Sequence, residues 1–234
     1  MNRLYRKFDF MSNFLLQELS EPDKRKVMSC FEPMTFKRGD RLFYEDGIPT
    51  GIFYITKGTV KKYKKVVGDQ EQIFYIYKEG DLLGYHALLS DERYQDSCEA
   101  LESITTEFIS KDNFMELMET IPSLKAAVIK NMAHEFGVLA NTIAVLAQKA
   151  QTPRLALFLL ILNNRYDSMG IKLSRQDLSN LIGATRESVG RTLKEFKDDG
   201  LIEIRDKKIF LVDMDKIISK VEMPLSVNRR LIDS

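Results

Sequence analysis

The sequence predicts an α+β protein in three parts: an N-terminal antiparallel β-roll of the jelly-roll kind, one long helix, and a C-terminal winged helix-turn-helix. Three observations support this prediction. Short alternating apolar and polar runs, separated by glycines, fill much of the first half of the chain. A segment with the spacing of a long amphipathic helix comes next, and a helix, a turn, a second helix and a hairpin follow it. We expect domains at residues 1–121, 122–150 and 151–234.

The composition is that of an ordinary globular chain. Of its 234 residues, 44% are hydrophobic and 29% are charged. The apolar runs are too short, and the first residues too polar, for a membrane span or a secretion signal, so we expect a cytoplasmic protein without a membrane partner. The net charge is +1, but residues 150–234 carry 15 basic against 12 acidic side chains. The small basic excess therefore lies in the C-terminal part.

The β-roll is predicted from the region that begins at Pro33. A short helical segment precedes it, from Phe14 to about Phe31, with Pro22 in position to start a helix. From Pro33 onward, segments with a period of two residues recur at intervals of about eight to twelve residues. Glycine suits the corners between them because it adopts a positive φ without steric cost. The corner glycines are Gly39, Gly58, Gly68 and Gly80.

The long helix is predicted between Pro122, which suits a first helical turn, and the Thr152-Pro153 pair, which suits the start of the next helix. Its apolar residues alternate spacings of three and four, as in a coiled coil. A helix packed only on its own sheet has no use for an apolar stripe along its whole length. We therefore expect a parallel homodimer. The stripe consists of Ile129, Met132, Phe136, Leu139, Ile143 and Leu146.

The C-terminal part contains two short helices in sequence. Ser174 suits the cap of the first helix, and Asp177, three residues on, completes a capping-box pattern. Gly183 ends that helix and Thr185 suits the cap of the next, which extends to the Asp199-Gly200 stop signal. In the second helix, Val189, Leu193 and Phe196 share one face.

Charged residues occupy the opposite face of that second helix. Arginine donates two hydrogen bonds to guanine, and glutamate accepts one from cytosine, so this face suits the major groove of DNA. The alternative is a solvated helix face. Two alternating runs around Asp206-Lys207-Lys208 predict a hairpin directly after the helix, and this context favours DNA. The outward residues are Arg186, Glu187, Gly190, Arg191, Lys194 and Lys197.

Two segments, Ser174–Asp177 and Gly183–Arg191, resemble the helix-turn-helix signature of the CRP/FNR superfamily of bacterial transcription regulators. The glycine pattern of the first part is similar to the β-roll of cyclic-nucleotide-binding domains. The resemblance implies a homodimer that binds a palindromic operator in double-stranded DNA, with TGTGA-like half-sites, and acts with RNA polymerase. It implies base contacts from Arg186, Glu187 and Arg191. Candidate phosphate contacts are Ser174, Arg175, Thr185, Ser188, Lys194, Lys207 and Lys208.

The expected effector pocket departs from the family pattern. The family's Gly-Glu pair, which holds the ribose, is Gly84-Tyr85 here, and its phosphate-binding Arg-Ser pair is replaced within Gln95-Asp96-Ser97. Asp96 would repel an anion. The two hydroxyl residues that contact the purine correspond to Leu139-Ala140. We therefore expect no cyclic AMP and no other known cofactor, and leave the effector unidentified. Candidate pocket residues are Gly84, Tyr85, His86, Gln95, Asp96, Ser97, Leu139 and Ala140.

The sequence contains few cysteines and histidines that could bind a metal. Cys30 and Cys98 match no metal spacing, and the N-terminal cysteine cluster of some FNR-like relatives is absent, so we expect no iron-sulfur centre. His86 and His134 are the only histidines, too few for a cupin-type metal site. We therefore expect no enzyme. Two alternatives stay open: a ligand sensor that acts through protein contacts, and a cyclic-nucleotide-responsive regulator with an atypical pocket.

Overall fold

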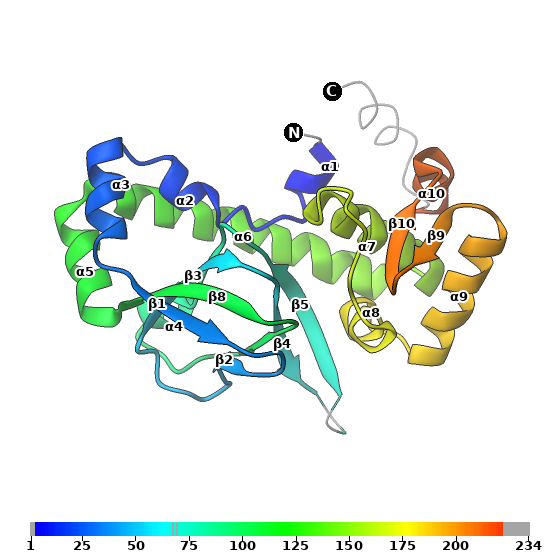
Figure 1. Cartoon of the computed structure of the whole chain (residues 1–234), viewed down its shortest axis with the longest axis horizontal. Helices are drawn as coiled ribbons and strands as arrows, with labels where there is room; N and C mark the ends of the chain where they lie inside the picture. The colour runs from blue at the N-terminus through cyan, green and yellow to red at the C-terminus, as the bar shows by residue number, and fades with distance from the viewer. Residues whose placement is uncertain (1–2, 67, 69, 222–234) are drawn as a thin grey trace. The chain divides into compact units, whose positions relative to one another are not determined.

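The computed structural model describes residues 3–66, 68 and 70–221 (Figure 1). It confirms the α+β class and the order of β-roll, long helix and helix-turn-helix. The chain forms two compact units, Phe10–Phe136 and a second that combines Gly137 onward with the residues before Phe10. The boundary between the units along the chain thus falls within the long helix, between Phe136 and Gly137. The three-domain division remains a prediction, and residues 222–234 of its last domain lie outside the described residues.

In the first unit, two short helices precede the sheets: α2 (Phe14–Gln17) and α3 (Glu21–Met28). Ser20 caps α3, because its hydroxyl accepts a hydrogen bond from the amide of Asp23 at 3.3 Å. Pro22 lies in the first turn, where its missing N–H costs no helical hydrogen bond. The predicted helix start at Pro22 is therefore confirmed to within one residue.

Two four-stranded antiparallel sheets form the β-roll (Figure 1). The first has the order β1-β8-β3-β6, with β1 (Glu32–Phe36), β8 (Ile104–Ser110), β3 (Gly51–Lys57) and β6 (Leu82–Leu83). The second has the order β2-β7-β4-β5, with β2 (Arg41–Phe43), β7 (Ser97–Ala100), β4 (Val60–Lys65) and β5 (Glu71–Tyr77). Non-consecutive strands are neighbours in both sheets, which is the crossed connectivity of a jelly roll rather than a meander.

Gly58 shows why a glycine is needed at a corner of this roll. Its φ is +95°, and a Cβ at this position would lie 2.6 Å from Cγ2 of Ile104. Both the backbone conformation and the close neighbour therefore require glycine between β3 and β4. Gly84, at φ +97°, leads in the same way into α4 (Tyr85–Ser90).

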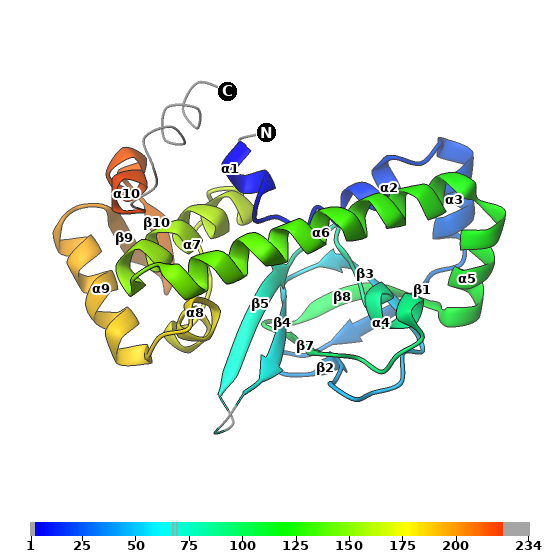
Figure 2. The ribbon, with the colours of Figure 1, turned by 180° about the vertical axis from the view of Figure 1, so that it is seen from behind.

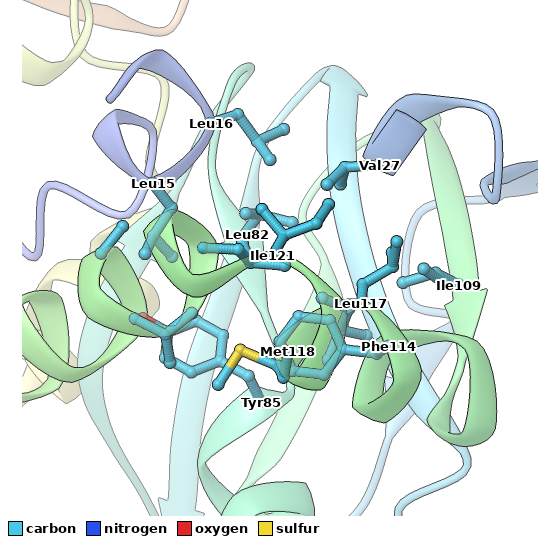
Figure 3. Packing of buried hydrophobic residues seen from close by; sticks show 14 of the residues in the cluster. Leu15, Leu16, Val27, Leu82, Tyr85, Ile109, Phe114, Leu117, Met118 and Ile121 are labelled. Atoms are coloured by element: carbon cyan, nitrogen blue, oxygen red, sulfur yellow. The ribbon is translucent and has the colours of Figure 1, made fainter. Parts of the chain in front are cut away.

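The core of this unit packs helices against the first sheet (Figure 3). Leu15 and Val27 of α2 and α3 join Ile109 of β8, Phe114 of α5 (Lys111–Thr120) and Tyr85 of α4 in one buried cluster. Each fully buried side chain of this size contributes about 1.5–3 kcal/mol. Leu124, Ala127 and Val128 belong to the same cluster, so the first turns of the long helix are part of the β-roll core.

The long helix, α6 (Pro122–Gln148), is continuous over 27 residues (Figure 2). The predicted apolar stripe is largely exposed on it: Phe136 is 77% exposed, Ile143 is 64% and Ile129 is 59%. Buried apolar residues occupy other positions of the same helix, Val128, Val138 and Val145 among them. Within the described residues, α6 therefore has one apolar face that is buried against the rest of the chain and a second apolar face that is exposed. No helix in the described ranges is long and apolar enough to cross a membrane.

In the second unit, α7 (Gln151–Arg165) begins at Gln151, with Ala150 as its N-cap. The predicted start of this helix at the Thr152-Pro153 pair, with Thr152 as its cap, is therefore wrong. Pro153 does not fix the first position, because a proline is tolerated anywhere in a first turn, where the amides have no helical partner. Arg165, at the other end of α7, is 5% exposed and its guanidinium donates to both carboxylate oxygens of Asp9, at 3.0 and 3.1 Å. The short helix α1 (Arg3–Arg6) precedes Asp9.

The winged helix-turn-helix follows α7 (Figure 1). It contains α8 (Arg175–Ile182), α9 (Arg186–Asp198), β9 (Ile202–Arg205), β10 (Lys208–Leu211) and α10 (Met214–Lys220). Helix α10 packs on α7, with Ile217 fully buried.

Candidate DNA-reading surface and effector cavity

Both helix caps of the helix-turn-helix are as the sequence predicts. The Ser174 hydroxyl accepts the amide of Asp177 at 3.0 Å and starts α8. Gly183, at φ +62°, ends it, and its left-handed conformation is one that glycine adopts freely. The Thr185 hydroxyl accepts the amide of Ser188 at 3.2 Å and starts α9. The turn between the two helices is thus set by local hydrogen bonds.

The orientation of α9 is fixed by its inner face. Val189, Leu193 and Phe196 are 0%, 1% and 2% exposed. Because these three residues cannot turn outward without loss of their burial, the residues on the opposite arc are held toward solvent. This is the arrangement of a recognition helix that presents a fixed set of side chains.

The outward residues of α9 are available for a partner. Arg186, Glu187, Arg191 and Lys194 are exposed. Their side chains form no hydrogen bond or ion pair within residues 3–66, 68 and 70–221. Gly190 lies among them, and a Cβ there would meet nothing nearer than Nη1 of Arg175, at 4.0 Å. The protein itself therefore gives no steric reason for a glycine in the middle of this helix, where it costs about 1 kcal/mol relative to alanine.

The predicted phosphate contacts fall into two groups. Arg175, Lys194 and Lys207 are exposed at the surface. Ser174 and Thr185 are exposed as well, but their hydroxyls serve as helix caps. The Ser188 hydroxyl is half-buried and donates to the side-chain oxygen of Gln151. Lys208 donates to the carbonyl oxygen of Met169 at 3.4 Å.

The wing is a tight hairpin. Asp206 and Lys207 have φ values of +49° and +62°, as in the two-residue turns that match the twist of antiparallel strands. Ile209 pairs with Ile171 on its other side, which ties the wing to the segment before α8. The guanidinium of Arg205 lies over the ring of Phe210 at 4.5 Å. Lys207 is therefore held at an exposed tip.

The first unit contains a cavity of about 210 Å³ in the β-roll. Of the predicted effector residues, Gly84, His86, Gln95 and Asp96 line it. The other members lie elsewhere: Tyr85 is buried, the Ser97 hydroxyl accepts the amide of Glu45 at 3.0 Å, and Leu139 and Ala140 are exposed on the part of α6 that belongs to the second unit. The remaining lining residues are Phe43, Lys62, Tyr77, Ala87, Ser90, Tyr94 and Met132.

Lys62 is the lining residue of greatest chemical consequence that the sequence pattern did not reveal. Its amino group lies 3.1 Å from the Asp96 carboxylate, with side chains only 13% and 17% exposed. The repulsion that Asp96 alone would exert on an anion is therefore offset by Lys62. Equally, Lys62 already has a carboxylate partner. Side chains alternate between the two faces of a strand, so Lys62 lies on the same face of β4 as the buried Val60. This alternation is the signal in the sequence that could have identified Lys62.

A second polar group links the cavity to α6. His86 lines the cavity, and its Nε2 contacts the Glu135 carboxylate of α6. The Tyr85 hydroxyl donates to the other oxygen of Glu135, and the Asn131 amide donates to that same oxygen at 2.8 Å. Burial, and after it the charge of Glu135, raises the pKa of Tyr85 well above its ordinary value, so this phenol remains a donor. Glu135 is 2% exposed and is therefore held by three donors.

The cysteines do not form a redox or metal group in the described ranges. Both are free thiols, and no cluster of three or more His, Cys, Asp or Glu side chains occurs among the described residues. Cys98 is fully buried, and burial raises its pKa well above the ordinary value. Because an iron-sulfur cluster of the common kind needs four thiolates, two cysteines with one of them buried do not fit it.

Two family descriptions match the chain. A cyclic nucleotide-binding domain matches residues 33–121, which covers the β-roll, and a Crp-like helix-turn-helix domain matches residues 153–219. Among curated proteins, the chain is 29% identical over 184 residues to Electron transport regulator A of Shewanella oneidensis, across 76% of this chain and 73% of that protein. It is 28% identical over 212 residues to the Anaerobic regulatory protein of Haemophilus influenzae, across 86% and 79%.

Solved structures agree on the fold. FixK2 from Bradyrhizobium japonicum superposes with a TM-score of 0.77 at 19% identity, across 83% of this chain and 98% of that one. The c-di-GMP responsive regulator CLP of Xanthomonas campestris gives a TM-score of 0.71 at 20% identity, across 83% and 100%. The β-roll and the helix-turn-helix, together with these similarities, lead to one conclusion. The chain belongs to the CRP/FNR superfamily of transcription regulators.

Proposed function

We propose that this regulator binds a palindromic site in double-stranded DNA as a homodimer, with TGTGA-like half-sites read by Arg186, Glu187 and Arg191. The observation that carries the proposal is the outward arc of α9, which is exposed and unpaired within the described residues while the inner arc is buried. Arginine in such an arc donates two hydrogen bonds to guanine, and each good pair discriminates by about 1–3 kcal/mol.

Phosphate contacts position the reading helix on the duplex. Arg175, Lys194 and Lys207 are exposed cations that can serve without a change in the protein. Ser174 and Thr185 stand at helix N-termini, where backbone amides also favour phosphate. Ser188 and Lys208 would first have to leave their partners, Gln151 and the Met169 carbonyl, so we assign them a lesser part.

The dimer is proposed to form through the exposed stripe of α6. Exposed apolar residues at coiled-coil spacing lose contact with water when a second copy packs against them. A two-fold dimer places its recognition helices in successive major grooves, about 34 Å apart. Two stripe members, Met132 and Leu146, are already half-buried. The other four are exposed and would be buried in the dimer: Ile129, Phe136, Leu139 and Ile143.

For the effector we propose a molecule other than cyclic AMP, bound in the β-roll cavity. A cyclic phosphate needs an unpaired cation, and Lys62, which lines the cavity, is paired with Asp96. We further propose that the protein acts in the cytoplasm with RNA polymerase and is not an enzyme, as its family suggests.

The base-reading assignment is tested with the Arg186→Ala/Arg191→Ala double variant. Footprinting first locates the palindrome protected by the wild-type protein. The double variant is expected to lose protection of that palindrome while it keeps weak, salt-sensitive binding to any duplex. Protection of the same palindrome by the double variant would show that these arginines do not read bases.

A further inference from the structure

The charged side chains that line the β-roll cavity already have partners within the protein. Lys62 and Asp96 neutralise one another at 3.1 Å, and His86 contacts the Glu135 carboxylate. An added anion would compete with Asp96 for Lys62, and an added cation would compete with Lys62 for Asp96. Either exchange gives up an existing ion pair that is largely shielded from water. An uncharged ligand avoids this cost.

Three aromatic rings, those of Phe43, Tyr77 and Tyr94, form part of the cavity wall. The rings of Phe43 and Tyr94 are stacked at 4.1 Å between centroids, and Tyr77 and Met132 also line the cavity. Burial raises the pKa of Tyr94 to about 12, so it stays uncharged. The volume of about 210 Å³ is modestly larger than the roughly 150 Å³ that accommodates benzene in an apolar protein cavity. A single substituted ring therefore fits the size and the walls.

The His86 ring specifies the polar group of such a ligand. Its Nε2 faces a carboxylate that can only accept, so in the neutral ring Nε2 carries the proton and Nδ1 is an acceptor. No partner for Nδ1 occurs among the described residues of the chain. The side chain is 34% exposed and lines the cavity. A ligand that satisfies Nδ1 of the neutral ring must bring an O–H or N–H donor.

We propose that the cavity binds a small uncharged aromatic molecule with one hydrogen-bond donor, of the phenol class, and that His86 transmits its binding to Glu135 of α6. A ligand on Nδ1 polarises and repositions the same ring that holds Glu135. Glu135 in turn holds Tyr85 and Asn131, so a shift of the ring changes how α6 is held against the β-roll. The DNA-control part of this inference rests on the function proposed above.

Binding is tested by calorimetry on the full-length protein with phenol, and with anisole as the matched compound that has the ring but no donor. Phenol is expected to bind at least about fivefold more tightly than anisole, the effect of one hydrogen bond. His86→Phe keeps a ring against Tyr85 but should abolish the preference. His134→Phe, at the other histidine, should retain it. Equal affinities for phenol and anisole, or no binding of phenol, overturn the proposal.

The tautomer gives a second test that needs no ligand. The chain has two histidines, so their ring nitrogens are readily assigned by long-range 1H–15N NMR. The proton of His86 is expected on Nε2, and addition of phenol should shift the Nδ1 resonance. A proton on Nδ1 in the free protein overturns the assignment of His86 as acceptor.

The link to DNA is tested by fluorescence anisotropy on the palindromic duplex. Phenol should change the DNA affinity of the wild-type protein, and Glu135→Gln should bind phenol yet lose that change. An unaltered response in Glu135→Gln, with its fold checked by circular dichroism, overturns the role of Glu135. Absence of DNA binding with and without phenol contradicts the proposed function, whereas the calorimetry still decides the cavity by itself.

Discussion

Arg191 and Lys194 lie three residues apart on the outward arc of α9, yet they differ in what they can recognise. The planar guanidinium of Arg191 matches the two acceptors of guanine, whereas the Lys194 ammonium is a point charge that suits any phosphate. Both are exposed and unpaired within the described part of the chain. Their substitution should therefore have different consequences.

We expect Arg191→Ala to relax base preference, because it removes about 1–3 kcal/mol of discrimination at one position. Lys194→Ala should weaken all sequences alike and reduce the slope of log K against log salt by about one unit. Anisotropy titrations on operator and scrambled duplexes, at several salt concentrations, measure both effects. A sequence-dependent loss in Lys194→Ala would place that lysine on a base.

The two thiols also differ at the residue scale. Cys98 is fully buried with a raised pKa, whereas Cys30 is half-buried and its sulfur donates to the Lys26 carbonyl at 3.6 Å. Only the thiolate reacts with a disulfide reagent, and a raised pKa leaves less thiolate at any pH below it. In the native protein, Cys30 should react and Cys98 should not, even at about pH 9. Rapid reaction of a Cys30→Ser variant would contradict this.

At the scale of elements, α6 is notable for its two apolar faces. Phe136→Asp places a charge in the exposed stripe, where a second copy would bury it unpaired. We expect this variant to sediment as a monomer at concentrations where the wild type is a dimer. Ala144→Asp is the control, because Ala144 is exposed on the same helix but about 100° round from its neighbour Ile143. A dimeric Phe136→Asp variant would place the interface elsewhere.

The ends of a helix could be predicted from the sequence where they are set by residues next to one another in the chain. The caps at Ser174 and Thr185 and the stop at Gly183 are local features, and the structure confirms each one. The start of α7 was not predictable, because a proline tolerated within a first turn does not mark its first residue. Predicting the cavity lining requires the register between strands. Alternation in β4 defines two faces, but a lysine is usually assigned to the solvent-facing one, so Lys62 was missed.

At the scale of the whole molecule, sequence distance limited the prediction of contacts. Tyr85 and His86 were identified by position, but their partners Glu135 and Asn131 lie about fifty residues further on, and no local pattern connects them. The same limitation applies to Gln151, whose side-chain oxygen accepts a hydrogen bond from the Ser188 hydroxyl. Fold order was predictable from periodicity, whereas the chemistry of the cavity depended on side chains that only folding brings together.

In the second unit, Asp9 of the N-terminal segment pairs with Arg165 of α7. We expect Asp9→Ala to lower the stability of this unit by about 1–3 kcal/mol, because a nearly buried guanidinium loses charged acceptors. The unfolding of the β-roll should be unaffected. Differential scanning calorimetry, with Asp23→Ala in α3 as the control, separates the two transitions. A shift confined to the β-roll transition would contradict this expectation.

Glu135 and Phe136 are neighbours on α6, yet one is 2% exposed among cavity-linked polar groups and the other is 77% exposed in the stripe. A rigid helix cannot rotate one of them without rotating the other. If the cavity and the stripe act as proposed, occupancy of the first and pairing of the second are thermodynamically linked, and linkage is reciprocal. Effector affinity would then depend on protein concentration, and the regulator would respond to its own abundance as well as to its ligand.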